Sequence, residues 1–198
     1  YESNQADALL GNITSSDVNN DGFSDVIVGA LLYDNGQTDE GKVFAFYGSS
    51  GGLPVNPNWN AEVNQSGAYL GSISGAGDVN CDGYQDIIVG AKGFDNPETD
   101  EGRIFLYYGS ASGLLSTPAW TAESNQGGAQ FGFSVDSSPD FKAFGCSNVI
   151  VGAPYFDNAY TDAGKVFVYA DTITPAPIDS FEISNIYFPG KVPVIYGY

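Results

Sequence analysis

The sequence has no histidine and no methionine in 198 residues, and it has only two cysteines and six basic residues. The absence of histidine removes the commonest general base and the commonest transition-metal ligand. Twenty-four acidic residues against six basic ones give a formal net charge of −18. This charge repels phosphate, so we expect neither nucleic acid nor an anionic membrane as a partner. No apolar run approaches the roughly 20 residues of a membrane-spanning helix.

Glycine is abundant, with 26 residues, and aromatic residues make up 14% of the chain. This composition suits many short strands joined by tight turns. One phrase occurs twice, as DVNNDGFSDVIVGA from Asp17 to Ala30 and as DVNCDGYQDIIVGA from Asp78 to Ala91. A weaker copy, NVIVGA, ends at Ala153, so the three alanines are spaced by 61 and 62 residues. This fixed spacing indicates a repeat protein.

Each full copy of the phrase begins with a candidate calcium loop. Oxygen-bearing side chains stand at positions 1, 3, 5 and 9, and glycine at position 6 permits the positive φ of a tight curl. Ca²⁺ takes roughly six to eight oxygen ligands, and the backbone carbonyl of position 7 would supply one of them. The sequence therefore predicts two Ca²⁺ sites, formed by Asp17, Asn19, Asp21, Phe23 (carbonyl) and Asp25, and by Asp78, Asn80, Asp82, Tyr84 (carbonyl) and Asp86.

The alternative interpretation of these loops is a pair of Asx turns, because Asp, Asn and Gly favour turns on their own. Three carboxylates within nine residues repel one another unless a cation lies among them, which favours calcium. Mg²⁺ is disfavoured because it requires strict octahedral geometry and keeps its waters. The third repeat should bind no metal, since its corresponding positions hold Asp140, Lys142, Phe144 and Asn148.

The segments around the loops predict short strands in the same order in every repeat. The expected strands lie near residues 10–14, 26–30, 42–47 and Trp59, then 70–74, 87–91, 103–108 and Trp120, then 131–135, 149–153 and 165–169. Four short strands about every sixty residues are typical of a β-propeller blade, and the alternative is a β-sandwich with accidental Asp-rich turns. The expected fold class is all-β, with three four-stranded blades and an extended, strand-like C-terminal tail.

The chain divides into five expected segments. Residues 1–7 match the end of an outer strand and belong to a preceding blade. The blades occupy residues 8–67 and 68–129, each with a calcium loop, and residues 130–171, with a degenerate loop. Residues 172–198 form a Pro-rich linker and a strand-prone tail.

The unit FG-x-S, followed by a D-x-N-x-D-G-x-x-D loop and VGAP, resembles the FG-GAP repeat of integrin α-subunit propellers and of many bacterial secreted proteins. It is most complete as Phe131–Val135 and Val151–Pro154, with LGSIS at Leu70–Ser74. The resemblance covers about residues 1–170. It implies a seven-bladed propeller with Ca²⁺ loops on one rim and a role in adhesion or ligand display, with catalysis uncommon. This sequence contains three such blades.

Cys81 and Cys146 lie in corresponding loops of neighbouring repeats. A disulfide between them requires their Cα atoms within about 7 Å, which the sequence does not determine. Tyr1 is not an initiator methionine, so we expect the numbering to begin after processing or inside a longer product. An extracellular location is expected, since the millimolar calcium outside cells suits such loops.

Other recurrent residues have two interpretations each. Trp59 and Trp120 are candidate glycan-stacking platforms or inter-blade packing residues. Asn12 and Asn64 begin glycosylation sequons. The repeated polar turns form either an acidic binding rim or solvated hairpin turns, through Asp34, Asp39, Asp95, Asp100, Asp157 and Asp162.

The function expected from the sequence is non-enzymatic. Glu62 and Glu123 are the only recurrent glutamates outside turns, and no second carboxylate at glycosidase spacing is evident. The leading hypothesis is an extracellular calcium-binding structural or adhesion protein that assembles with itself head to tail, as a fibre or a ring, through open blade edges and its tail. The alternatives are a lectin-like propeller that binds glycans, a binder of other extracellular proteins, and a fragment of a longer secreted propeller.

Overall fold

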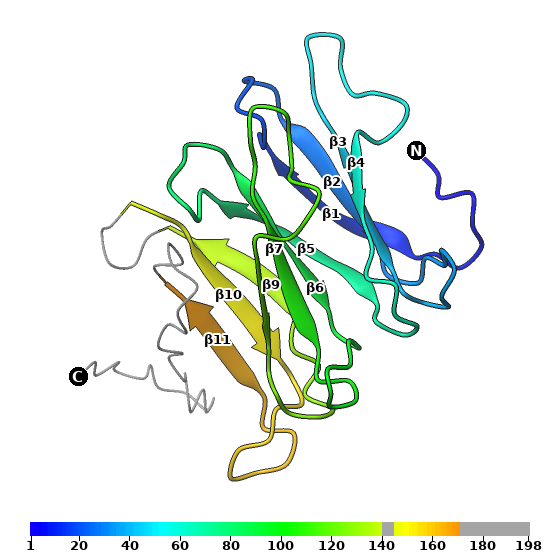
Figure 1. Ribbon diagram of the computed structural model, residues 1–198, viewed down its shortest axis with the longest axis vertical. Coiled ribbons are helices and arrows are strands. Elements are labelled where there is room, and N and C mark those ends of the chain that lie inside the picture. Colours follow the sequence, from blue (N-terminus) through cyan, green and yellow to red (C-terminus); the bar gives the residue numbers. More distant parts are fainter. Residues whose placement is uncertain (140–144, 171–198) are drawn as a thin grey trace, which may run out of the picture.

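The computed structural model describes residues 1–139 and 145–170, which form three antiparallel sheets and no helix (Figure 1). The first sheet contains β1 (Leu10–Ser16), β2 (Asp25–Ala30), β3 (Lys42–Phe46) and β4 (Trp59–Ala61). The second contains β5 (Leu70–Gly77), β6 (Asp86–Ala91), β7 (Arg103–Tyr107) and β8 (Trp120–Glu123). The third contains β9 (Ser134–Ser138), β10 (Asn148–Ala153) and β11 (Lys165–Tyr169). The expected all-β fold of blade-like antiparallel sheets is confirmed.

The third blade differs from the other two. Its described residues hold three strands, in the order β9-β10-β11, whereas the first two blades have four strands each; in all three sheets the neighbours follow chain order. The strand expected at residues 131–135 begins only at Ser134. Gly132, with φ of 85°, turns the chain there, and Phe131 inserts its fully buried ring against Phe167 instead of joining the ladder.

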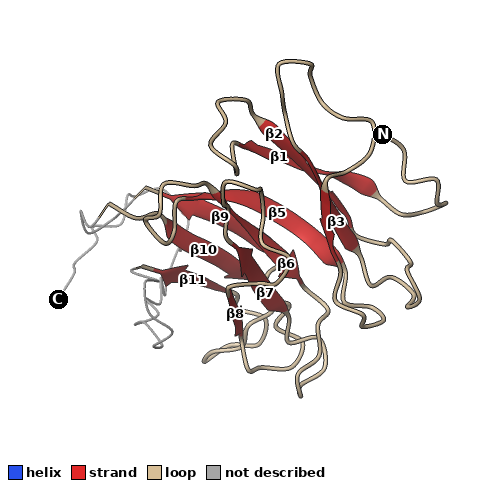
Figure 2. Cartoon of the chain, turned by 45° about the horizontal axis from the view of Figure 1, so that its top comes forward, coloured by secondary structure: helices blue, strands red, loops and turns tan. Residues whose placement is uncertain are grey.

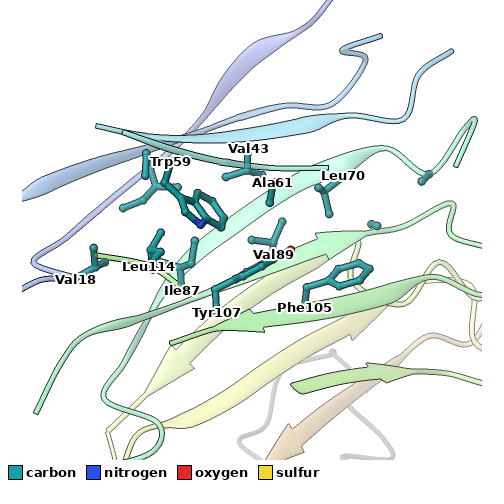
Figure 3. Close-up of a cluster of buried hydrophobic side chains, with 14 residues drawn as sticks. Val18, Val43, Trp59, Ala61, Leu70, Ile87, Val89, Phe105, Tyr107 and Leu114 are labelled. Carbon is teal, nitrogen blue, oxygen red and sulfur yellow. The ribbon is translucent and has the colours of Figure 1, made fainter. Parts of the chain in front are cut away.

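The blades stack face against face, as Figure 2 shows for β5, β6 and β7 beside the first sheet. Side chains alternate between the two faces of a strand, so each sheet contributes to two cores. Ile87 and Val89 of β6 pack in the core shared with the first blade (Figure 3), while Ile88 packs in the core shared with the third. All six residues of β6 are buried, which explains its continuous β-branched run.

Glycine in the middle strands allows backbones of adjacent blades to touch. A Cβ added to Gly29 would lie 2.2 Å from the carbonyl oxygen of Gly71, and one added to Gly90 would lie 2.1 Å from that of Gly132. The repeated V-G-A phrase is therefore a contact point between blades. Among the described residues, no helix is long and apolar enough to cross a membrane.

Candidate metal-binding loops

The two Asp-rich loops occupy the same place in neighbouring blades. Residues 17–25 connect β1 to β2, and residues 78–86 connect β5 to β6. Since the two blades share one strand order, both loops lie at the same rim of the stack (Figure 1).

The last carboxylate of each loop fixes the loop to the sheet. Asp25 is fully buried, and its two oxygens accept hydrogen bonds from the backbone N–H groups of Val18 (2.9 Å) and Gly48 (2.8 Å). Asp86 repeats this arrangement with Val79 (2.8 Å) and Gly109 (2.9 Å). A buried carboxylate thus joins the start of each loop to the chain just after the third strand of the blade, β3 or β7.

The first carboxylate holds the curl of the loop. Asp17 accepts hydrogen bonds from the N–H groups of Asp21 (3.1 Å) and Gly22 (2.9 Å), and Asn19 also accepts from Asp21 (3.1 Å). In the second loop Asp78 accepts from Asp82 (3.0 Å) and Gly83 (2.8 Å). The Asx turns that the composition favours are therefore present, and they place the carboxylates near one another.

The carboxylates of each loop interact electrostatically. Burial raises the pKa of Asp86 to about 7; the N–H groups of Gly109 and Val79 oppose this rise, and the nearby Asp82 and Asp78 carboxylates add to it. The pKa of Asp25 is raised for the same reasons, burial first. A divalent cation among these oxygens would reverse the repulsion.

The donor set fits a hard cation, but the loops are not closed around a point. Among residues 1–139 and 145–170, no three acidic, histidine or cysteine side chains converge as a metal cluster. The carboxylate oxygens that accept one N–H each keep a further lone pair for a cation. Binding would require Asp17, Asp21 and Asp25 to draw together around the ion, and Asp78, Asp82 and Asp86 likewise.

The family model described as FG-GAP repeat matches residues 11–46 and 70–107, which are the two blades with full loops. These two segments are FG-GAP repeats. Integrin alpha-8 of Gallus gallus is 33% identical over 168 residues, which are 79% of this chain and 15% of that protein. Integrin alpha pat-2 of Caenorhabditis briggsae is 32% identical over 193 residues, which are 89% of this chain and 15% of that protein. A phosphatidylinositol-glycan-specific phospholipase D of Mus musculus is 30% identical over 165 residues, which are 79% of this chain and 20% of that protein.

The chain thus spans about a sixth of the length of the integrin relatives that it matches.

The third blade of this chain departs from the pattern of the Asp-rich loops. Asp140, Lys142 and Phe144 lie outside the described residues. Asn148, in the place of Asp25 and Asp86, is 1% exposed and donates its side-chain amide to the carbonyl of Pro139 (2.9 Å).

Cys81 and Cys146 form a disulfide, with their Cα atoms 5.2 Å apart. Cys81 stands in the second Asp-rich loop, and Cys146 stands just before β10 of the third blade. The degenerate loop segment is therefore covalently joined to the loop of its neighbour.

Both tryptophans face the next blade. Trp59 is 8% exposed, its ring packs edge-on to Tyr107 at 5.0 Å, and its Nε1 donates to the carbonyl of Leu115. Trp120 packs on Tyr169 at 4.9 Å. These contacts are the inter-blade packing that their repeat positions suggest, and they leave little of Trp59 for a sugar to stack on.

The two sequons differ in accessibility. The side-chain amide of Asn12 donates to the carbonyl of Gly71 in the second blade (2.8 Å), so a glycan on Asn12 would break an inter-blade contact. Asn64 is exposed.

The repeated acidic turns are closed by their own side chains. Asp34, Asp95 and Asp157 each accept a hydrogen bond of 2.7 Å from the N–H group five residues later. This favours the structural interpretation of these turns.

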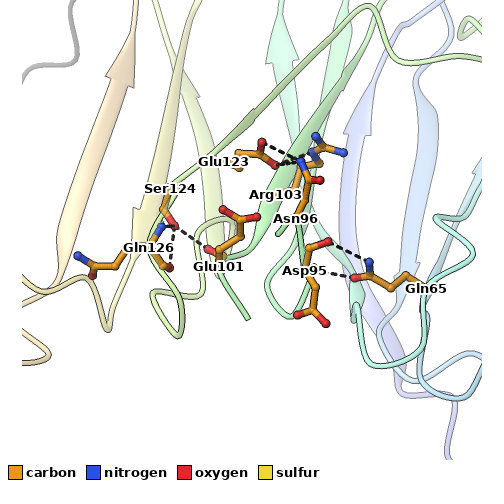
Figure 4. Close-up of polar contacts among 8 residues, drawn as sticks. All are labelled: Gln65, Asp95, Asn96, Glu101, Arg103, Glu123, Ser124 and Gln126. Atoms are coloured by element: carbon orange, nitrogen blue, oxygen red, sulfur yellow. Dashed lines mark hydrogen bonds and ion pairs between the residues drawn. The ribbon is translucent and has the colours of Figure 1, made fainter. Parts of the chain in front are cut away.

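A glutamine in the segment that precedes each blade forms two hydrogen bonds with the backbone of an acidic turn in that blade (Figure 4). We call this contact the glutamine clamp, and it was not predicted from the sequence. The Gln65 side chain donates to the carbonyl of Asp95 (3.1 Å) and accepts from its N–H (2.7 Å). Gln5 does the same with Asp34, and Gln126 with Asp157. The sequence signal was the Asn-Gln pair, which recurs after 60 and then 61 residues.

Glu40 and Glu101, which correspond to each other in the first two blades, were also missed as buried residues. Both are fully buried, and no hydrogen bond reaches their carboxylate oxygens. Burial raises the pKa of each, although backbone N–H groups nearby oppose the rise. Glu62 and Glu123, considered above for catalysis, instead form ion pairs with Lys42 (2.7 Å) and Arg103 (3.1 Å).

Proposed function

We propose that this chain is a non-enzymatic, extracellular structural and adhesion module whose first two blades are stabilised by calcium. The observation that supports calcium most directly is the repetition of one loop, oxygen by oxygen, at the same rim of two blades. Each loop carries three acidic side chains whose mutual repulsion a Ca²⁺ ion relieves.

An extracellular location is supported by the disulfide, because such bonds persist in oxidising compartments. Adhesion is supported by the similarity to integrin alpha chains. One matched relative is named a phospholipase, but the match covers 20% of that protein. The chain has no histidine, and its recurrent glutamates lie in ion pairs, so nothing in its described residues favours hydrolysis.

Isothermal titration with CaCl₂ tests the calcium proposal. The unmodified protein should bind two ions, and D82A and D21A should bind one each, because each variant removes one position-5 ligand. D100A is the matched control, since Asp100 lies in an acidic turn at the other end of the second blade, and it should still bind two. A protein that binds no calcium, or that loses an ion in D100A, would contradict the proposal.

We further propose that the chain assembles with itself head to tail. The outer face of the first blade presents Val26, Val28 and Phe46 around a groove of about 700 Å³, with Ile13 and Val55 exposed beside it. The corresponding residues of the second blade, which include Ile87, Val89 and Tyr107, pack against the first blade.

The outer face of the third blade carries apolar residues that correspond to those with which the first blade contacts the second. Its Ile150, Val166 and Val168 correspond to Ile27, Val43 and Ala45, which are the residues that the first blade turns toward the second. A contact between unlike faces generates a ring if its rotation closes and a fibre if it does not. The expected tail contact, through residues 172–198, lies outside the described residues.

Light scattering at micromolar concentration in calcium tests this assembly. The unmodified chain should form species larger than a monomer, and V55D, which places a charge at the exposed edge of the groove, should shift them to monomers. Y160D is the control, because Tyr160 is 77% exposed on a turn of the third blade. A stable monomer that is unaffected by deleting residues 173–198 would overturn the assembly proposal and favour a first-blade face covered by further blades of a longer chain.

A further inference from the structure

The two calcium loops differ in how they are tied to the next blade. Their internal hydrogen bonds agree within about a tenth of an ångström at every shared position. The fourth loop position is Asn20 in the first loop and Cys81 in the second, and both residues adopt a left-handed φ, of 54° and 59°. Asn20 is exposed, whereas Cys81 is bonded to Cys146.

The third blade holds the second loop at two points. Cys146, which is 5% exposed, anchors the disulfide in the third blade. The adjacent Ser147 donates its N–H to the backbone carbonyl of Asp78, the first ligand position, at 2.8 Å. Cys81 stands between Asn80 and Asp82, so the covalent tie acts in the centre of the ligand set.

We propose that the Cys81–Cys146 disulfide positions the ligands of the second loop, so that this loop is the tighter calcium site and the only one whose affinity depends on redox state. The inference rests on the calcium function proposed above. A flexible loop must lose conformational freedom when it closes on an ion, and a cross-link that restricts the free loop removes part of that loss. Asn20 provides no such restriction in the first loop.

Reduction is chemically accessible because the Cys81 residue is exposed. A thiolate of a dithiol reductant attacks the Cys81 sulfur, and Cys146 leaves as a thiolate that takes up a proton. The second thiol of the reductant then displaces Cys81, which also leaves as a thiol. The reductant becomes a cyclic disulfide, and the protein gains two electrons and two protons.

The test measures the calcium Kd of each loop separately, by competition with a fluorescent chelator. D21A leaves only the second loop, and D82A leaves only the first. Each is titrated in the oxidised form and in dithiothreitol. We expect reduction to weaken calcium binding about tenfold in D21A, roughly the cost of ordering one or two further side chains, and less than twofold in D82A.

A second variant keeps the result independent of the reductant. D21A/C81N/C146S carries the asparagine of the first loop, and its Kd should match that of reduced D21A, with or without dithiothreitol. Equal affinities of oxidised and reduced D21A would overturn the inference while leaving the calcium function intact, as would an equal loss in D82A. Absence of calcium binding in both oxidised single variants would overturn the calcium function and the inference together.

Discussion

The third blade has the same strand pairing and glutamine clamp as the first two blades, which we call the blade frame, but it lacks their Asp-rich loop. The middle strand β10 pairs on both sides as β2 and β6 do, and Gln126 clamps the third blade as Gln5 and Gln65 clamp the others. Yet the third blade has Asn148 where the others have a buried aspartate, and Ala163 where they have a buried glutamate.

This comparison shows that the blade frame and the acidic loop are separable. The third blade forms with apolar strands, the glutamine clamp and the Cys81–Cys146 disulfide, without a buried aspartate or glutamate at the corresponding positions. Each loop of the first two blades adds three acidic residues and one buried valine, Val18 or Val79. Dependence on calcium and pH should therefore be confined to the first two blades.

The largest effect is expected from G90A, because its Cβ would meet the backbone of Gly132 at 2.1 Å, where nothing flexible can move aside. We expect a loss of about 3 kcal/mol in unfolding free energy. The matched change G152A meets only the Ser134 side chain, at 2.5 Å, and should cost about 1 kcal/mol or less. Urea denaturation of both variants decides this, and equal costs would refute the backbone-contact explanation.

Asp86 should stabilise the second blade even without calcium. D86A leaves the N–H groups of Val79 and Gly109 without their acceptor, and we expect a cost of about 2 kcal/mol in EDTA. In the third blade N148A removes one amide bond to Pro139 and should cost about 1 kcal/mol. Equal costs of D86A and N148A in EDTA would contradict the larger structural role expected for the buried aspartate.

The buried glutamates should make stability depend on pH. A pKa raised by folding means that the folded state binds the proton more tightly, so the contribution is favourable below the unfolded pKa and is lost as pH rises through the folded pKa. E40Q should therefore raise the melting temperature at pH 7.5, with a gain on the order of 1 kcal/mol, and should change little at pH 4. A163E adds a carboxyl at the corresponding but exposed position of the third blade, so it should change the melting temperature little at either pH. An E40Q gain that is equal at both pH values would contradict this account.

The glutamine clamps should have the smallest effect. Q126A removes two partly exposed hydrogen bonds to the Asp157 backbone and should cost about 1 kcal/mol. Q65A should cost the same, because its geometry is the same. Thermal melts compare the two, and a loss in only one blade would show that the clamp is not a shared part of the frame.

Much of the fold could be predicted from the sequence because the repeat multiplies weak signals. The recurrence of D-x-N-x-D-G and V-G-A fixed the blade spacing and most strand positions. The start of β9 was wrong because the insertion of Phe131 depends on Phe167 in another strand, a contact that local pattern does not contain.

The polar contacts between blades were harder to predict. Gln65 and Glu40 look like ordinary surface residues in the sequence, and only the packing of one blade on the next buries or pairs them. The disulfide stayed an open alternative because the 5.2 Å between the cysteine Cα atoms is a property of the blade stack.

Thermal unfolding in calcium and in EDTA tests the central claim most directly. At a calcium concentration of 100 times Kd, each occupied loop should add about 2.7 kcal/mol to the unfolding free energy. The melting temperature should therefore rise in calcium, rise by less in D82A, and stay at the EDTA value in the double variant D21A/D82A. An unchanged melting temperature of the unmodified protein in EDTA would contradict the account.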